Sequence, residues 1–313
     1  MKFIQDLREG DNAVEHYFCK KKETLKTKAG KSYMSLLLSD KTGSIPAKVW
    51  NLNNNIQSFD AGDYIKIDGV VSRFNDELQL SISKIRRSAA GEYLPADYVP
   101  VTDKPIDKMF EELVALINSI ENAHLSALLT AIFIKNQEVQ AAFCRHSAAK
   151  HMHHGYMGGL VEHTLAVAQI CEFLAPRYKH VDRDLLITSA LLHDIGKIYE
   201  LSDFPDNDYT DDGQLIGHIS QGYELLTVEI AKLEGFPRKL KSLLQHCILS
   251  HHGKYEFGSP RLPKTIEACI LSYADITDAH IKMFEEALNK APLNSDWVGY
   301  HKILARDIRK STY

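Results

Sequence analysis

The sequence predicts a protein of two domains, a small all-β barrel followed by an all-α domain. Between residues 12 and 86, apolar residues recur at every second position, which is the period of a β-strand. From Ile106 onward they recur at steps of three and four residues, which is the period of a helix. The intervening residues 88–105 follow neither period and hold several prolines, as linkers do.

The first domain, residues 1–90, contains five predicted strands. In the second of these, Met34, Leu36 and Leu38 share one face and Tyr33 lies on the other. Turn sequences rich in Gly, Asp and Asn separate the strands. Five short antiparallel strands in about 75 residues are typical of a closed barrel of the OB type. The strands are expected within residues 12–20, 31–38, 44–50, 64–71 and 77–85.

The predicted linker is residues 91–105, and the helical domain is residues 106–313. Seven segments of this domain show helical spacing, and no strand-like run of comparable strength follows residue 106. The expected helices are Asp107–Ser119, Ala123–Phe133, Gly159–Phe173, Asp184–His193, His218–Leu233, Pro237–Leu249 and Thr265–Leu288.

Composition describes an ordinary soluble globular protein, with 44% apolar and 25% charged residues in a chain of 313. We find no apolar run that could cross a membrane, and the first residues lack the apolar core of a signal peptide. The five cysteines are scattered and never form a CxxC pair, which predicts reduced thiols and a cytoplasmic location. The net charge is −4 overall but +4 over residues 1–90, which permits a basic first domain.

The helical region carries seven imidazole and carboxylate side chains that predict a metal site. Most lie at or near expected helix ends, and none is a cysteine, so nitrogen and oxygen ligands for a divalent cation are indicated. Seven ligands are too many for one tetrahedral ion; they fit two ions sharing a carboxylate, an arrangement suited to phosphoester hydrolysis. We interpret four lone histidines, at positions 124, 246, 280 and 301, as core or surface residues. The predicted ligands are His163, His193, Asp194, His218, His251, His252 and Asp275.

Four further residues are candidates for catalysis or for orienting a ligand. Lys197 is suited to holding a phosphate oxygen as a point charge, or alternatively to interacting with a helix dipole. His153 and His154 would line the pocket or protonate the leaving oxygen, unless they are plain surface histidines. Asp278 would orient a ligand histidine or face solvent. With Asp194, the predicted catalytic residues are Lys197, His153 and His154.

Residues of the first domain fit a single-stranded nucleic acid. Such strands are held by cations along the phosphates and by aromatic rings that stack on bases. The alternative is that Trp50 and Phe74 close the barrel core and that the lysines belong to a solvated turn. The predicted nucleic-acid-binding residues are Lys20, Lys22, Lys28, Lys31, Tyr33, Lys48, Trp50 and Phe74.

The pattern of His163, His193-Asp194 and Asp275 resembles the HD superfamily of metal-dependent phosphohydrolases, which implies an all-helical fold and these residues as ligands of a first metal. His218 and His251-His252 resemble the binuclear members, which implies a second metal bridged by Asp194. The strings at residues 153–164 and 249–260, together with the barrel, resemble the YhaM family of bacterial 3′–5′ exoribonucleases. This resemblance covers nearly the whole chain and favours manganese, although cobalt, iron and zinc also suit the ligands.

We therefore expect a metal-dependent exonuclease that shortens single-stranded RNA, and also single-stranded DNA, to nucleoside 5′-monophosphates. Its 3′ to 5′ direction follows from the resemblance alone. The alternative is a phosphohydrolase acting on a small nucleotide or a cyclic dinucleotide, which deletion of residues 1–90 would leave largely active. A non-enzymatic scaffold is disfavoured because every ligand position is filled. No membrane partner is expected, and a homo-oligomer is compatible with the sequence.

Overall fold

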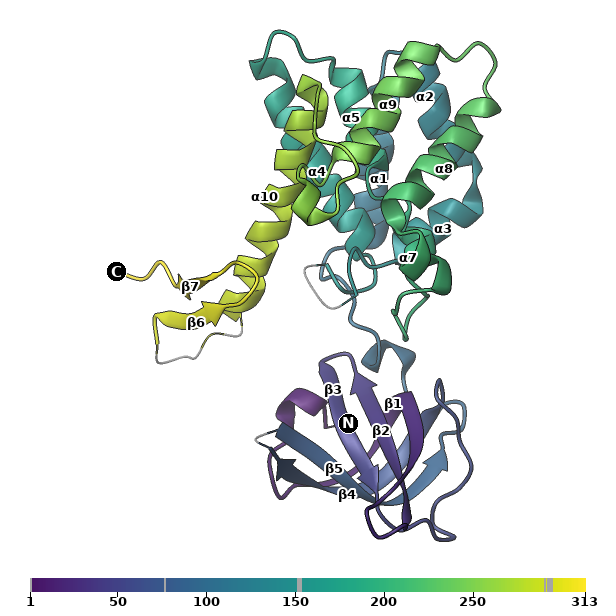
Figure 1. The fold of residues 1–313 in the computed structure, drawn as a ribbon, viewed down its shortest axis with the longest axis vertical. Coiled ribbons are helices and arrows are strands. Elements are labelled where there is room, and N and C mark those ends of the chain that lie inside the picture. Colours follow the sequence, from purple (N-terminus) through teal and green to yellow (C-terminus); the bar gives the residue numbers. More distant parts are fainter. Residues whose placement is uncertain (1, 76, 151–153, 290, 292–294) are drawn as a thin grey trace. The chain divides into compact units, whose positions relative to one another are not determined.

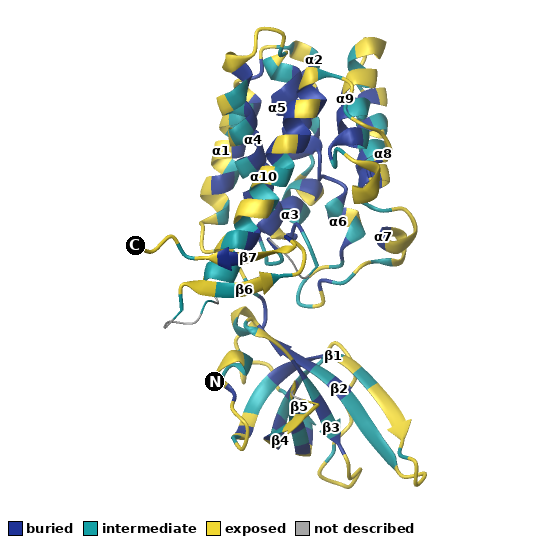
Figure 2. Ribbon diagram, turned by 60° about the vertical axis from the view of Figure 1, so that its left-hand side comes forward, coloured by how far each residue is buried: buried dark blue, intermediate teal, exposed yellow. Residues whose placement is uncertain are grey.

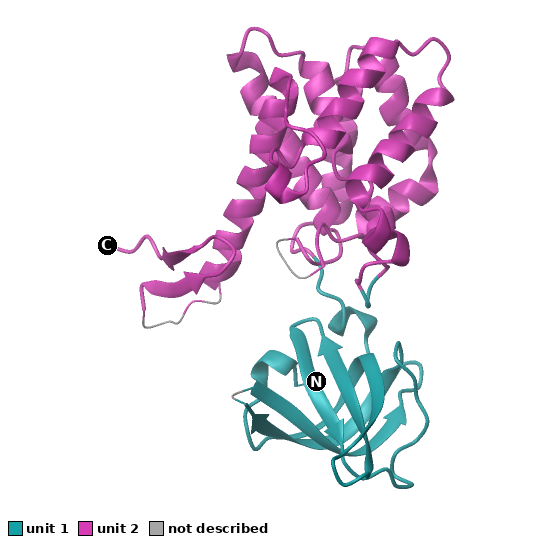
Figure 3. Ribbon diagram, viewed as in Figure 1, with its two compact units in different colours: residues 1–101, 204–206 teal, residues 102–203, 207–313 magenta. Residues whose placement is uncertain are grey.

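The computed structural model divides the chain into two compact units, each with its own apolar core (Figure 3). One unit comprises residues 1–101 and 204–206, and the other comprises residues 102–203 and 207–313. The expected fold class, a small β barrel followed by a helical domain, is confirmed. The structure describes all residues except 1, 76, 151–153, 290 and 292–294.

The first unit is a closed five-stranded barrel in which the strands neighbour one another in the order β1-β2-β3-β5-β4 (Figure 1). Strand β1 is long enough to pair with β4 through its first half and with β2 through its second half. The pairs are antiparallel except β3–β5, and this arrangement is that of an OB-type barrel. The strands are β1 Asn12–Lys26, β2 Ser32–Asp40, β3 Gly43–Val49, β4 Tyr64–Phe74 and β5 Glu77–Arg87.

The barrel core follows the alternation in the sequence. Leu36 and Leu38 are buried, as the two-residue period predicts, and every strand places buried residues between more exposed ones (Figure 2). Residues 91–101, which we expected within the linker, belong to this unit. Tyr98 is buried there, and its hydroxyl donates to the carbonyl oxygen of His16 at 3.2 Å.

The second unit is built around two helices, α4 and α5, which are buried along most of their length (Figure 2). All seven expected helices are present. Three short helices, α3, α6 and α7, were not expected. The described helices are α1 Ile106–Asn118, α2 Ala123–Leu129, α3 Gln137–Arg145, α4 Gly159–Leu174, α5 Arg183–Leu192, α6 Lys197–Glu200, α7 Asp211–Leu215, α8 His218–Ala231, α9 Arg238–Ser250 and α10 Ile266–Asn289.

Local sequence fixes where the helices that carry the predicted ligands begin and end. The Asp182 side chain accepts from the backbone N–H of Leu185 and caps the start of α5. Gly217, at φ +75°, precedes the first residue of α8, and Gly253, at φ +77°, follows the end of α9. Both positive φ angles favour glycine, so these two residues place the adjoining histidines at helix ends.

A β-hairpin follows α10 and was not expected. It is formed by β6, Trp297–His301, and β7, Arg306–Arg309. The strands are too short for the two-residue period to emerge, and a register shift between Trp297 and Gly299 interrupts it. Ile308 packs with Met283 of α10 in a small separate core. None of the helices in the described part of the chain has the length and apolar character that crossing a membrane requires.

Candidate metal centre

All seven predicted ligands converge in the second unit. His163 lies on α4, His193 and Asp194 follow the last residue of α5, and His218 is the first residue of α8. The remaining three come from the end of α9 and the middle of α10. Asp194 is almost completely buried and lies between the others.

The first group consists of His163, His193 and Asp275, whose ligand atoms lie within 4.8 Å of one another. Oδ2 of Asp194 lies 3.4 Å from Nε2 of His163 and 3.4 Å from Nε2 of His193. Oδ1 of Asp275 lies 3.2 Å from the same nitrogen of His163. Two imidazole nitrogens and two carboxylate oxygens thus surround one point.

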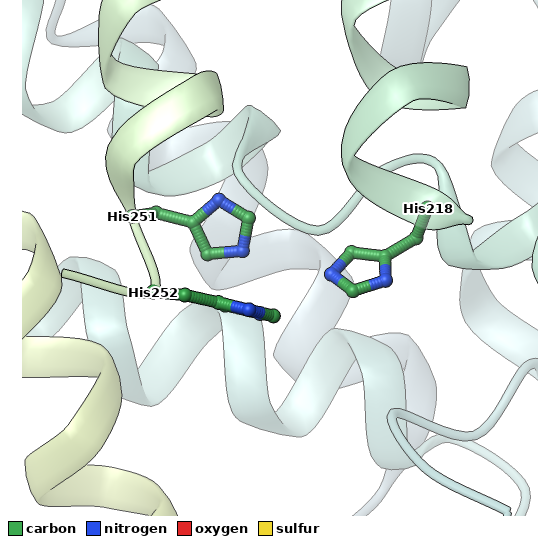
Figure 4. Close-up of side chains that lie close together, drawn as sticks. All are labelled: His218, His251 and His252. Carbon is green, nitrogen blue, oxygen red and sulfur yellow. The ribbon is translucent and has the colours of Figure 1, made fainter. Parts of the chain in front are cut away.

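The second group consists of His218, His251 and His252, whose ligand nitrogens also lie within 4.8 Å of one another. Figure 4 shows the three rings meeting from two directions, His218 from the start of one helix and the other two from the end of another. The other carboxylate oxygen of Asp194, Oδ1, lies 3.5 Å from Nε2 of His218 and 3.6 Å from Nε2 of His251. Asp194 therefore directs one oxygen to each group.

Backbone carbonyls fix the orientation of three of these histidines. Nδ1 of His193 donates to the carbonyl oxygen of Ala190 at 2.8 Å, and Nδ1 of His251 donates to that of Ile248 at 2.7 Å. Nδ1 of His252 donates to the carbonyl of Phe257 at 2.8 Å. A carbonyl oxygen can only accept, so Nδ1 carries the proton and Nε2 keeps a lone pair for a metal.

Two carboxylates orient the other two histidines. Asp278 Oδ2 accepts from Nδ1 of His163 at 2.7 Å, which is the first of the two roles we considered for this residue. Glu200 Oε1 contacts Nδ1 of His218 at 2.9 Å and accepts from its backbone N–H at 3.0 Å. We did not predict Glu200. Its spacing offers a weak signal, because Asp194, Lys197 and Glu200 recur at steps of three residues.

The electrostatics of the site favour ionised carboxylates and neutral imidazoles at His251 and His252. Burial opposes ionisation of Asp194, but Lys197 and the surrounding histidines outweigh it and hold the pKa well below its usual range. Burial lowers the pKa of His251, and burial together with the neighbouring imidazoles lowers the pKa of His252 to about 3. Burial also opposes protonation of His163, whose pKa is nevertheless raised by the carboxylates around it.

Three buried atoms of the site lack a hydrogen-bond partner: Oδ1 of Asp194, Nε2 of His218 and Nε2 of His251. Buried polar atoms are nearly always paired, and an unpaired one is costly. The two nitrogens lie 3.5 Å and 3.6 Å from Oδ1 of Asp194, and each belongs to a ring whose Nδ1 already contacts an acceptor oxygen. A divalent cation would satisfy them together, so the residues present fit a metal.

Lys197 and His154, two of the predicted catalytic residues, lie around this centre. Nζ of Lys197 donates to Oδ2 of Asp194 at 2.5 Å. Its ammonium group is therefore directed at the Asp194 carboxylate. His154 is buried, and its Nε2 contacts Oδ2 of Asp278 at 2.9 Å, so it reaches the centre through that carboxylate. His153 lies outside the described residues.

On the barrel, three of the predicted nucleic-acid-binding residues form one surface cluster. The rings of Tyr33 and Trp50 stack with centroids 4.9 Å apart, and Nζ of Lys48 lies 5.6 Å from the Tyr33 centroid. Trp50 is 44% exposed and Phe74 is 64% exposed, so neither ring closes the barrel core.

The predicted lysines of the barrel differ in their surroundings. Lys22 donates to the carbonyl of Phe59 and contacts Asp60 at 3.4 Å, which gives it a structural role in the loop before β4. Lys31 donates to Asn51, beside Trp50. Lys28 lies exposed in the β1–β2 turn, and Lys20 is partly buried on β1.

Comparisons with known proteins match both units. The HD domain family matches residues 160–280, and an OB-fold nucleic acid binding domain family matches residues 20–87. A protein called 3′–5′ exoribonuclease YhaM from Halalkalibacterium halodurans is 34% identical over 284 residues, or 89% of this chain and 87% of that protein. The YhaM protein of Shouchella clausii is 35% identical over 92% of this chain and 90% of its own length. The YhaM protein of Bacillus subtilis is 32% identical over 91% of this chain and 90% of its own length.

Among solved structures, the second OB-fold domain of replication protein A from Methanococcus maripaludis matches 29% of this chain and 95% of that chain, at 24% identity and a TM-score of 0.23.

An HD domain with this cluster of histidines and aspartates is that of a metal-dependent phosphohydrolase, here joined to a nucleic-acid-binding barrel. The relatives narrow this class further, because their identity exceeds 30% over at least 89% of this chain. The chain belongs to the YhaM family of 3′–5′ exoribonucleases. This confirms the family that the sequence resembles.

Proposed function

We propose that this protein is a metal-dependent 3′–5′ exoribonuclease that hydrolyses single-stranded RNA to nucleoside 5′-monophosphates. The observation that carries the proposal is the position of Asp194, which directs one carboxylate oxygen to each of two groups of buried nitrogen and oxygen atoms. Membership of the YhaM family supports the polarity and the RNA substrate.

Each of the two groups would hold one divalent ion, and Asp194 would be a ligand of both ions. Such a pair lowers the pKa of a water molecule and neutralises charge on the phosphoryl oxygens. Manganese is the proposed metal, and the thiolate-free ligand set also suits iron, cobalt and zinc.

The residues around the ligands have roles of their own in this proposal. Lys197 is a partly buried cation beside Asp194, and in the loaded enzyme its ammonium group would hold a non-bridging phosphate oxygen of the substrate. Asp278 fixes the ring of His163, and His154 fixes Asp278 in turn. We therefore assign His154 to positioning rather than to proton transfer.

The barrel would hold the strand that is being shortened. The Tyr33–Trp50 stack with Lys48 offers ring faces and a cation, which is how sequence-tolerant domains bind single strands. Stacking and phosphate contacts do not read the 2′-hydroxyl, so we propose single-stranded DNA as a second substrate. A cytoplasmic location is also part of the proposal, supported by five cysteines that are all free.

The test is to incubate the purified protein with a 5′-labelled RNA and each divalent cation in turn. A ladder of products shortened from the 3′ end, with nucleoside 5′-monophosphates released, is the expected result. Replacing His193→Ala together with Asp194→Ala should abolish the ladder while RNA binding survives, because the barrel is unchanged. Cleavage that persists in this variant would refute the site assignment.

A further inference from the structure

The segment that follows His251 and His252 carries two exposed aromatic rings. We call residues 253–264 the platform loop. Within it, Tyr255 is 60% exposed and Phe257 is 53% exposed, and neither belongs to an apolar core of the described residues. A single 3-10 turn, Tyr255–Phe257, holds both rings. The loop has no part in orienting the metal ligands except through one backbone carbonyl.

The backbone of the platform loop is fixed against the helix that supplies two ligands. The carbonyl of Phe257 accepts from Nδ1 of His252 at 2.8 Å. Ser259 Oγ donates to the carbonyl of Leu249 at 3.2 Å, and the backbone N–H of Arg261 donates to the same carbonyl at 3.1 Å. The rings are therefore attached to a backbone that hydrogen bonds hold against the end of α9 and the predicted ligand His252.

Cations accompany the rings. Nζ of Lys254 lies 5.3 Å from the centroid of the Phe257 ring and 3.9 Å from a carboxylate oxygen of Glu256. Arg261 and Lys264 are also exposed in this loop, which leaves it with more positive than negative side chains. Ring faces beside cations match the bases and phosphates of a single strand.

We propose that the platform loop is the subsite for the terminal bases of single-stranded RNA, with Tyr255 and Phe257 stacking on bases and Lys254 contacting the phosphate between them. The proposal rests on the proposed exoribonuclease function. RNA is favoured over a protein partner because the strand end that is hydrolysed must lie at the metal centre, which the loop adjoins. Stacking accepts every base, so this subsite allows continuous shortening without sequence preference.

The variant that tests the subsite is Tyr255→Leu with Phe257→Leu in the full chain, which removes both rings and keeps apolar side chains. The carbonyl of residue 257 remains, so the contact with His252 and the bound metal should be retained. A matched control is Phe173→Leu with Tyr178→Leu, two rings that are 61% and 50% exposed near the far end of α4. Phe173 lies about 15 Å along that helix from the ligand His163.

The expected result is a KM for RNA that rises about fivefold to 150-fold for each ring lost, with metal content as in the unaltered protein. The control variant should keep the original KM. A 2-aminopurine base at the 3′ end, whose fluorescence falls on stacking, should be quenched by the unaltered protein and not by the platform variant. RNA with two abasic 3′-terminal nucleotides offers no terminal bases for stacking. With this RNA, the unaltered protein and the platform variant should have similar KM values.

Equal KM values and equal quenching in the platform and control variants would overturn the subsite. If the double variant loses its metal, the single variant Tyr255→Leu replaces it, because the Tyr255 ring is the more exposed of the two. The KM for RNA and the quenching of 2-aminopurine are then measured with that variant. Failure of the proposed function is a separate outcome, in which the unaltered protein does not shorten RNA with any divalent cation. Quenching that depends on Tyr255 and Phe257 would still support base stacking in that case.

Discussion

Histidine can donate or accept at either ring nitrogen, and at five positions this chain removes that freedom. Three histidines donate through Nδ1 to backbone carbonyls a few residues away in the chain. The other two are held by the carboxylates of Asp278 and Glu200. All five therefore present Nε2 to Asp194 or to its neighbours. In the proposed metal site, these hydrogen-bond partners should therefore affect metal affinity as well as the ligands themselves.

Removing an orienting carboxylate should weaken metal binding without removing a ligand. Asp278→Asn keeps the size of the side chain but lacks the charge that holds Nδ1 of His163, so we expect about a 10- to 100-fold loss of metal affinity. Titration calorimetry with Mn²⁺ measures the change. Glu285→Gln, an exposed carboxylate on the same helix, is the control and should leave the affinity unaltered. An unaltered affinity for Asp278→Asn would show that His163 is oriented by other contacts.

The ligand types could be predicted from the sequence because pairs such as His193-Asp194 and His251-His252 are rare in a helical region. The orienting residues are harder to predict. Glu200 comes from a four-residue helix that no apolar period reveals, and its contact with His218 is created by folding. Backbone carbonyls, which hold three of the histidines, carry no sequence signal at all.

At the scale of elements, the centre depends on the close approach of α6 and α8. A Cβ atom at Gly196 would lie 2.1 Å from the carbonyl oxygen of His218 and 2.6 Å from the backbone nitrogen of Gly222. Only glycine permits this packing, since backbone atoms cannot move aside as a flexible side chain can. Gly196 thus keeps the His193-Asp194 turn against the first turn of α8.

Gly196→Ala should therefore separate the two elements and destabilise the protein, by about 1–3 kcal/mol as in other overpacked cores. Thermal unfolding would show a lower Tm, and metal titration would show weaker binding by the second group. Gly222→Ala is a matched control on the facing helix, because its Cβ would meet its nearest neighbour at 3.4 Å, an ordinary contact. Equal Tm values for the two variants would contradict this account of the packing.

Long periodic elements could be predicted from the sequence, whereas short ones could not. Helix α4 and the barrel strands repeat their apolar period several times, but α6, α7 and the two strands after α10 end before a period is established. Trp50 is a related case. Alternation placed it away from the aliphatic face, but its stacking on Tyr33 required the register of β2 and β3.

At the scale of the whole molecule, the barrel and the helical unit have separate apolar cores. The metal centre lies entirely in the helical unit, and the Tyr33–Trp50 cluster lies entirely in the barrel. In the proposed function, hydrolysis and stacking of the terminal bases belong to the helical unit, and the barrel holds the rest of the strand. The order of the two domains was predictable from the change of period near residue 90.

A chain that begins at Thr102 should keep the chemistry and lose the capture of RNA. We expect it to hydrolyse the small diester bis(p-nitrophenyl) phosphate at the rate of the full chain, with a strongly raised KM for RNA. Circular dichroism confirms that the helical unit is folded. The same KM for RNA with and without the barrel would contradict the assignment of strand binding to the barrel.

The most direct measurement is titration of the metal-free protein with Mn²⁺, followed by electron paramagnetic resonance, which distinguishes a coupled pair of ions from isolated ones. The account predicts two ions for each chain with a coupled spectrum, and replacement of the coupled spectrum by isolated signals or by none when Asp194 becomes Asn. A single uncoupled ion, or a coupled pair that Asp194→Asn leaves unchanged, would contradict it.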